Sequence, residues 1–265
     1  MIDKRISMDE AVEWIETGTT LALGGMTLYR RPFAFIRGLI QHNQQCGEPK
    51  DLTLLAFTCS LESDLLVGAG LVSRTRTCYF GLEIFGLAPM FTFYANCGEL
   101  EVLEETEASL AFGLRARLAG VGFMPGRAWI GTDLPKLRPD VCRVIDPYSG
   151  EELMAFPAIL PDIAVIHALQ ADPEGNACIG ENQGVDIELA LAADQVIVTT
   201  EEIVPELSKA DLVSPIVSAI VLAPHGARPS SCHPSYPLDG EAYLSYVEQV
   251  SDPASFAHFL KTWLI

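Results

Sequence analysis

The 265-residue sequence predicts an α/β fold, with an open, mostly parallel β-sheet that carries helices on both faces. Two observations predict it. Short apolar runs typical of buried strands alternate along the chain with segments whose apolar residues recur at helical spacing. The composition, 49% hydrophobic and 20% charged, is typical of a globular protein with a large core. We therefore expect residues 1–265 to form a single domain.

The first half of the chain alternates between predicted helices and strands. Ser7 and Glu10 have the spacing of a capping box, so a helix should begin there and end at Gly18. Residues 21–23 predict a strand, and Pro32 suits the first position of the next helix. Two further strands and one helix are expected at residues 52–57, 78–80 and 105–118.

The second half continues this alternation. The apolar run Ile163–Ile166 predicts a buried strand that ends at His167, and the composition of Asp172–Asn176 predicts a turn. The proline-rich segment 134–140 is interpreted as a long loop within the single domain. The remaining strands are expected at residues 196–199 and 219–222, and the remaining helices at residues 188–193 and 253–263.

Composition argues against several classes of protein. A net charge of −18 argues against binding to nucleic acid or to an anionic membrane. The seven cysteines form no C-x-x-C pair, which favours reduced thiols in a cytoplasmic protein. There is no run of 18 apolar residues and no apolar signal core at the start. No histidine pair has zinc spacing, so no metal is expected.

Polar residues accompany the end of the buried strand. His167 and Gln170 are candidates to line a ligand site, because ligands of open α/β sheets bind beyond the C-terminal ends of the strands. The alternative is that His167 only hydrogen-bonds the backbone of the following loop.

Gly24 and Gly25 lie between a predicted strand and a predicted helix. We expect exposed backbone N–H groups there, which favour an anion or a developing oxyanion. The chain lacks the dinucleotide fingerprint, the P-loop and the serine-hydrolase elbow. Two groups of arginines could neutralise an anionic ligand or simply be solvated surface charges: Arg30, Arg31 and Arg37, and Arg115 and Arg117.

Four segments resemble the A (α) subunits of the family I CoA-transferases, nearest to the glutaconate CoA-transferase type. They are residues 161–176, 21–27 with Arg31 and Pro32, 185–203 and 221–230, and they span most of the chain, with residues 80–110 matching least. The resemblance implies the CoA-transferase fold and a coenzyme A thioester as substrate, with no bound cofactor. It also implies a partner, the B (β) subunit, in a heterodimer or an (αβ)2 heterotetramer. In this family the B subunit carries the glutamate nucleophile.

The resemblance places Glu181, Asn182 and Gln183 in a loop that lines the substrate pocket or the subunit interface. It does not make Glu181 the nucleophile, because that glutamate belongs to the B subunit.

The segment from Gly81 to Met90 departs from the transferase type, which carries a more polar loop at this place. Phe80, Glu83 and Phe85 are candidates to contact the substrate. An apolar pocket would suit a bulky acyl chain, and it would also promote loss of a desolvated carboxylate as CO2.

Glu107 is the one member of an acidic run that is followed by apolar residues. A carboxylate in such a place can serve as a catalytic acid or base. In some ring-cleaving hydrolase relatives of the family, a glutamate stands at this part of the helix. The alternative is that Glu107 only stabilises the N-terminus of its helix.

Several functions therefore stay open. CoA transfer by a two-chain enzyme is the first interpretation. Decarboxylation of a 3-methylglutaconyl-CoA-like substrate and hydrolysis of an acyl-CoA ring, both on the same fold, are alternatives. A further alternative, outside enzymes, is a binding or regulatory subunit without catalysis.

Overall fold

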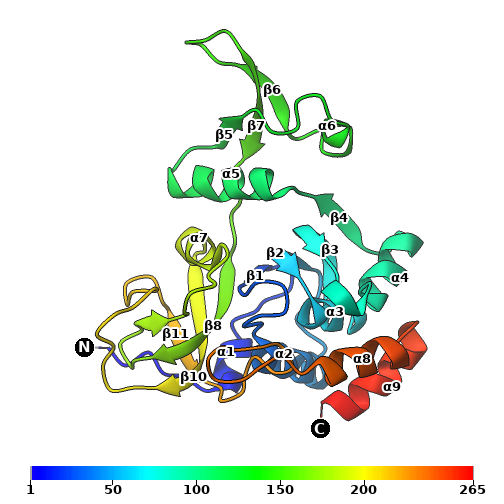
Figure 1. The fold of residues 1–265 in the computed structure, drawn as a ribbon, viewed down its shortest axis with the longest axis vertical. Helices are drawn as coiled ribbons and strands as arrows, with labels where there is room; N and C mark the ends of the chain where they lie inside the picture. The colour runs from blue at the N-terminus through cyan, green and yellow to red at the C-terminus, as the bar shows by residue number, and fades with distance from the viewer. Residues whose placement is uncertain (1, 265) are drawn as a thin grey trace.

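Seven parallel strands form the main sheet in the computed structural model, which describes residues 2–264 (Figure 1). Their order across the sheet is β11-β10-β8-β1-β2-β3-β4, and a short strand β9 pairs antiparallel with β8. The predicted open, mostly parallel sheet is thus confirmed. The strands are β1 Thr20–Leu23, β2 Leu52–Cys59, β3 Val72–Phe80, β4 Glu101–Glu104, β8 Ile163–Ala171, β9 Ala177–Cys178, β10 Gln195–Ile203 and β11 Ala219–Leu222.

Helices cover both faces of this sheet, as predicted. In β1, Leu21 and Leu23 point into one apolar layer and Ala22 points into the other, which is the alternation expected of a strand buried on both sides. The first layer is built with α1 Met8–Val12, α2 Phe33–Cys46, α3 Leu61–Gly68, the 3-10 helix η1 Glu83–Phe85, α4 Pro89–Cys97, α8 Gly240–Gln249 and α9 Pro253–Trp263. The second layer is built with α5 Glu107–Leu118 and α7 Asp186–Ala192.

Several predicted boundaries are wrong. Strands β3 and β10, predicted at residues 78–80 and 196–199, run over Val72–Phe80 and Gln195–Ile203. The capping box of Ser7 and Glu10 forms, but α1 ends at Val12 instead of Gly18, because the chain turns there to bury Ile15. Pro32 is the N-cap of α2 and precedes its first turn. Strand β8 continues past His167 to Ala171, so His167 lies inside the strand.

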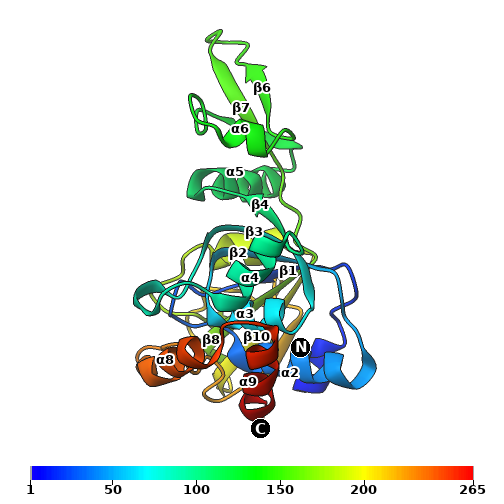
Figure 2. The same ribbon diagram turned by 90° about the vertical axis from the view of Figure 1, so that its right-hand side faces the viewer.

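A smaller sheet stands apart from the main body. It belongs to residues 121–160, which we call the arm and which project from the main body in both views (Figures 1 and 2). The arm contains an antiparallel sheet in the order β5-β7-β6 and a core of four buried residues, Trp129, Val141, Met154 and Phe156. The predicted loop 134–140 contains a short helix. The elements are β5 Phe123–Gly126, α6 Leu134–Leu137, β6 Cys142–Ile145 and β7 Glu152–Pro157.

The described helices include none that combines the length and apolar character needed to span a membrane.

Candidate functional site

A tight turn follows β1 at Gly24 and Gly25. A Cβ atom on Gly25 would lie 2.7 Å from the carbonyl oxygens of Tyr29 and Arg30, and its φ is +90°, so the position requires glycine. The Gly25 N–H donates to the Asp186 carboxylate at 2.9 Å, and the Gly24 N–H donates to a backbone carbonyl of β8. The prediction that the Gly24 and Gly25 N–H groups are exposed is therefore wrong, because both groups are buried and already hydrogen-bonded.

Two buried arginines hold this turn from inside. Arg30 pairs with Asp186 at 2.7 Å and donates to the carbonyl oxygens of His167 at 2.6 Å and Asn182 at 3.0 Å. Arg31 pairs with Glu62 and donates to the carbonyl oxygen of Gly25 at 2.8 Å.

The arginine groups of the sequence therefore serve mainly structural contacts. Both Arg30 and Arg31 are fully buried, so the expectation that they could meet an anionic ligand is wrong. Arg37 stacks over Trp263, and Arg117 pairs with Asp194. Arg115 is exposed.

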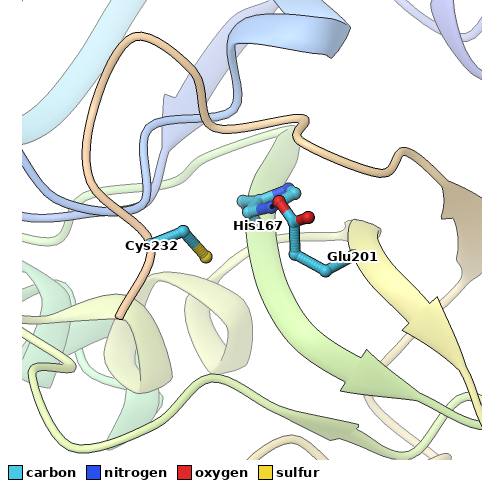
Figure 3. Close-up of side chains that lie close together, drawn as sticks. All are labelled: His167, Glu201 and Cys232. Atoms are coloured by element: carbon cyan, nitrogen blue, oxygen red, sulfur yellow. Dashed lines mark hydrogen bonds and ion pairs between the residues drawn. The ribbon is translucent and has the colours of Figure 1, made fainter. Parts of the chain in front are cut away.

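His167 is the centre of a buried hydrogen-bonded cluster between β8 and β10 (Figure 3). Its Nδ1 lies 2.9 Å from Thr199 Oγ1, and its Nε2 lies 2.8 Å from Glu201 Oε1. Glu201 also accepts a hydrogen bond from the Tyr236 hydroxyl and one from the His225 N–H at 2.6 Å. We call His167, Thr199, Glu201 and Tyr236 the His167 cluster.

The environment shifts the pKa values of this cluster. Burial acts to raise the pKa of Glu201, but the hydrogen bonds from His167, Tyr236 and His225 outweigh it and lower that pKa to about 2. Burial lowers the pKa of His167, and the neighbouring Glu201 offsets this only in part. Together these shifts favour a neutral imidazole beside a carboxylate.

Three side chains of this region lie close enough together to hold a metal ion. Ligand atoms of His167, Glu201 and Cys232 lie within 4.8 Å of one another (Figure 3). The carboxylate already accepts three hydrogen bonds. Burial, together with the Glu201 charge, raises the pKa of the Cys232 thiol to about 12, which keeps it protonated at neutral pH. These side chains therefore form a structural cluster. Binding a metal ion would require breaking hydrogen bonds of Glu201 and deprotonating Cys232.

The two candidates His167 and Gln170 do not lie on one side of the strand. They are three positions apart in β8, so strand alternation points them to opposite faces. His167 is fully buried and does not line the pocket beside the end of β8. The Gln170 amide instead donates to Glu202 on β10 at 2.7 Å.

A pocket of about 640 Å³ lies beside the last residues of β8. Glu181 and Asn182 line it, together with Tyr29 and Leu169. Gln183 is not among the lining residues and donates to the carbonyl oxygen of Gly180 at 3.0 Å. The other lining residues are Gly180, Ser231, His233 and Pro234. The pocket therefore lies near the C-terminal ends of the strands, where the sequence predicts a ligand site. The roles of its lining residues stay predictions.

Two of the three candidates at and after the end of β3, Phe80 and Phe85, stack on other aromatic rings. Phe80 stacks on Phe91 with ring centroids 4.1 Å apart, and Phe85 stacks on Tyr243 at 5.2 Å. Both rings are partly buried and pack against the core, and their contact with substrate stays a prediction. Glu83 is exposed beside them, in a strained backbone conformation with φ +55°.

Glu107 is exposed in the first turn of α5, so its predicted place among apolar groups is wrong. The buried side of this helix is instead formed by residues that include Ser109 and Leu110. Burial raises the pKa of Cys78 to about 12, and the nearby negative charge of Glu107 adds to this shift. The buried carboxylate of this segment is Glu105, which pairs with two arginines, Arg76 and Arg138.

Residues 5–218 match the model of the family described as coenzyme A transferase. The chain belongs to the coenzyme A transferase family. The resemblance of its sequence to A subunits of this family is confirmed by curated relatives. This chain is 33% identical to the A subunit of 3-oxoadipate CoA-transferase from Pseudomonas knackmussii, covering 98% of this chain and 93% of that one. It is 31% identical to the cholesterol ring-cleaving hydrolase IpdA subunit of Rhodococcus jostii, covering 99% and 92%.

Solved structures of similar proteins have the same fold as this chain. A variant of the decarboxylase AibA/AibB superposes with a TM-score of 0.89 at 34% identity, covering all of this coenzyme A transferase chain and 99% of that chain. Glutaconate coenzyme A-transferase from Acidaminococcus fermentans superposes with a TM-score of 0.90 at 27% identity, covering 98% and 88%. Transferase, decarboxylase and hydrolase names thus all occur among the relatives of this coenzyme A transferase chain.

Sequence reasoning missed most partners of the site. Glu201 and Thr199 lie in one of the segments that carry the family resemblance, which is a signal that could have singled them out. Tyr29 and Tyr236 gave no signal, because their roles arise only when distant segments of the coenzyme A transferase chain meet.

The His167 cluster predicts a specific acid sensitivity. The folded pKa of Glu201, about 2, lies below its usual 4.5, so its stabilising effect is present above pH 4.5 and lost as pH falls toward 2. The lowered pKa of His167 adds a loss that begins as pH falls below its usual 6.5. Glu201→Gln should remove the step between pH 4.5 and 2. Urea unfolding across this range measures it, with Glu202→Gln as control, and a Glu201→Gln profile parallel to wild type would contradict the assignment.

Proposed function

We propose that this chain is the A subunit of a two-chain enzyme that moves coenzyme A between carboxylic acids and takes its nucleophile from a B chain. The proposal is supported by the partners of the buried carboxylates of this chain. Glu62, Glu105 and Asp186 each pair with a buried arginine. The buried Asp64 accepts from the Tyr246 hydroxyl and two backbone N–H groups, and Glu201 accepts three hydrogen bonds. Attack on a thioester by a carboxylate requires a free one beside the substrate. The one carboxylate among the described residues that line the pocket is the exposed Glu181, which the family resemblance places in a lining loop and does not make the nucleophile.

The proposed substrate is the coenzyme A thioester of a short acid with a second polar group. The relatives act, by name, on 3-oxoadipate and glutaconate, which are both dicarboxylic acids. The pocket beside β8 combines the apolar surfaces of Tyr29 and Leu169 with the polar Asn182. Such a lining suits a chain with an apolar middle and a polar end.

The test is reconstitution with the B-type coenzyme A transferase chain of the same genome. With glutaconyl-CoA and acetate, we expect acetyl-CoA from the two-chain complex, with ping-pong kinetics. The isolated chain should be slower by roughly 10³-fold or more, since it lacks the nucleophile. Equal rates for the isolated chain would contradict the proposal. Glu181→Gln in the complex is the control, and its loss of the covalent intermediate would move the nucleophile to this chain.

Decarboxylation is the second candidate, and two observations favour it. The chain is 34% identical over its whole length to a chain of the decarboxylase AibA/AibB. Ile84 and Leu87, 90% and 71% exposed, give the segment beside Glu83 an apolar surface that could desolvate a carboxylate. CO2 release from 3-methylglutaconyl-CoA that does not depend on acetate would favour this candidate over transfer. Glu107 stays a predicted acid or base for a hydrolytic reaction.

A further inference from the structure

The small sheet of the arm has two faces of different chemistry. Its inner face packs on α5, where Phe112 stacks on Phe156 with ring centroids 5.3 Å apart. A Cβ atom on Gly126 would lie 2.6 Å from the Phe112 ring, which places this glycine on the same inner face. Register pairs Met154 with Gly126 and with Arg143, so these residues share the inner face as well.

Strand alternation then fixes the members of the opposite face. We call it the outer face. It includes Phe123 and Pro125 from β5, Cys142 and Val144 from β6, and Leu153 and Ala155 from β7.

The outer face has the character of an interface. It holds no charged side chain, although the whole chain carries a net charge of −18. Phe123 is 44% exposed, and Pro125 and Cys142 are exposed too. The arm projects from the main body in both views (Figures 1 and 2). An uncharged face with exposed apolar residues is the kind of surface that binds another chain.

We infer that the outer face of the arm is the docking surface for the B chain of the proposed two-chain enzyme. This inference rests on the two-chain part of the proposed function. Relatives of this chain are named as the A subunits of their enzymes, and the decarboxylase AibA/AibB is named for two components. A second copy of this chain is the less favoured occupant, because two chains of charge −18 repel each other.

The native cysteines allow a direct test. Cys142 is exposed on the outer face, whereas the exposed Cys46 and Cys97 lie in α2 and α4 of the main body. The chain is treated with N-ethylmaleimide alone and in complex with the B-type chain of the same genome, and labelling is read by mass spectrometry. In the complex, Cys142 should react at least tenfold more slowly, while Cys46 and Cys97 keep their rates. Unchanged labelling of Cys142 in a verified complex overturns the inference.

A matched pair of variants provides a second measurement. Phe123→Lys places a charge on the outer face, and Leu137→Lys places one at a 65% exposed residue of α6 in the same arm. Because both residues are exposed, both variants should fold with the melting temperature of the wild type. Phe123→Lys should raise the Kd for the B chain at least tenfold and Leu137→Lys less than twofold. Equal affinities would overturn the inference.

Other outcomes distinguish an error in the inferred docking partner from an error in the proposed function. If sedimentation shows that the isolated chain dimerises, and Phe123→Lys abolishes the dimer, the outer face binds a second copy and the inference is wrong. If no complex with the B chain forms, both the inference and the two-chain assembly fail. If the complex forms through the outer face but turns over no acyl-CoA, the proposed function alone fails.

Discussion

Asp186→Ala is expected to lower the free energy of unfolding by about 3–5 kcal/mol, because it leaves a buried charge without a partner. The Asp186 carboxylate is 1% exposed, and it accepts from Arg30 at 2.7 Å and from the Gly25 N–H at 2.9 Å. Without it, the Arg30 guanidinium and the turn after β1 lose their shared acceptor. Urea unfolding measures the loss.

Asp194→Ala is the matched control for this prediction. Asp194 also pairs with an arginine, Arg117, at 2.6 Å, but its side chain is 64% exposed. Water solvates the remaining arginine when such a surface pair is broken, so the loss should stay below about 1 kcal/mol. If both variants lose the same small amount, Arg30 and Asp186 do not anchor the turn from inside. A double variant, Arg30→Met with Asp186→Leu, should recover part of the loss because it removes both charges.

The middle of the main sheet could be predicted from the sequence because β1, β2 and β8 are apolar on both faces, whereas the mostly exposed edge strand β4 was missed. Runs such as Ile163–Ile166 need no partner to be recognised. The end of β8 was less predictable. Its continuation carries His167 and Gln170, and these polar residues are tolerated in the strand only because Thr199, Glu201 and Glu202 on β10 bond them.

The site was predicted less completely than the fold, because its geometry depends on contacts between distant segments. The N–H groups of Gly24 and Gly25 looked free in sequence, yet Asp186 occupies one of them from 161 residues away. Burial of Arg30 follows from the same contact. Chain order carries no signal for such partners, whereas the local capping box at Ser7 was predicted correctly from four adjacent residues.

The arm was missed for a different reason. Its strands β5 and β6 are four residues long, which is too short for alternation to separate a strand from a loop. The prolines at 135 and 139 further favoured a loop. Only the pairing of β5 and β6 with β7 between them reveals a sheet.

His167→Ala should destabilise the fold and should not act mainly on turnover. The imidazole is fully buried and hydrogen-bonds Thr199 and Glu201. Removing it leaves a cavity, takes the ring partner from the buried Thr199 hydroxyl and removes one of the three hydrogen bonds to Glu201, so a total loss of roughly 3–5 kcal/mol is expected. Gln170→Ala on the opposite face of β8 is the control. It breaks only a partly exposed bond to Glu202 and should lose less than about 1 kcal/mol.

The two-chain complex distinguishes a structural from a catalytic role for His167. If the His167 cluster acts by holding β8, β10 and the Tyr236 segment together, the folded fraction of His167→Ala should keep a kcat within a few-fold of the wild type. Its melting temperature should fall by roughly 5–20 °C for a chain of this length. A variant that melts with the wild type but loses turnover would mean that His167 reaches the substrate when the B chain is bound. That outcome would return His167 to the catalytic site, and the cluster would then be a device for positioning its imidazole.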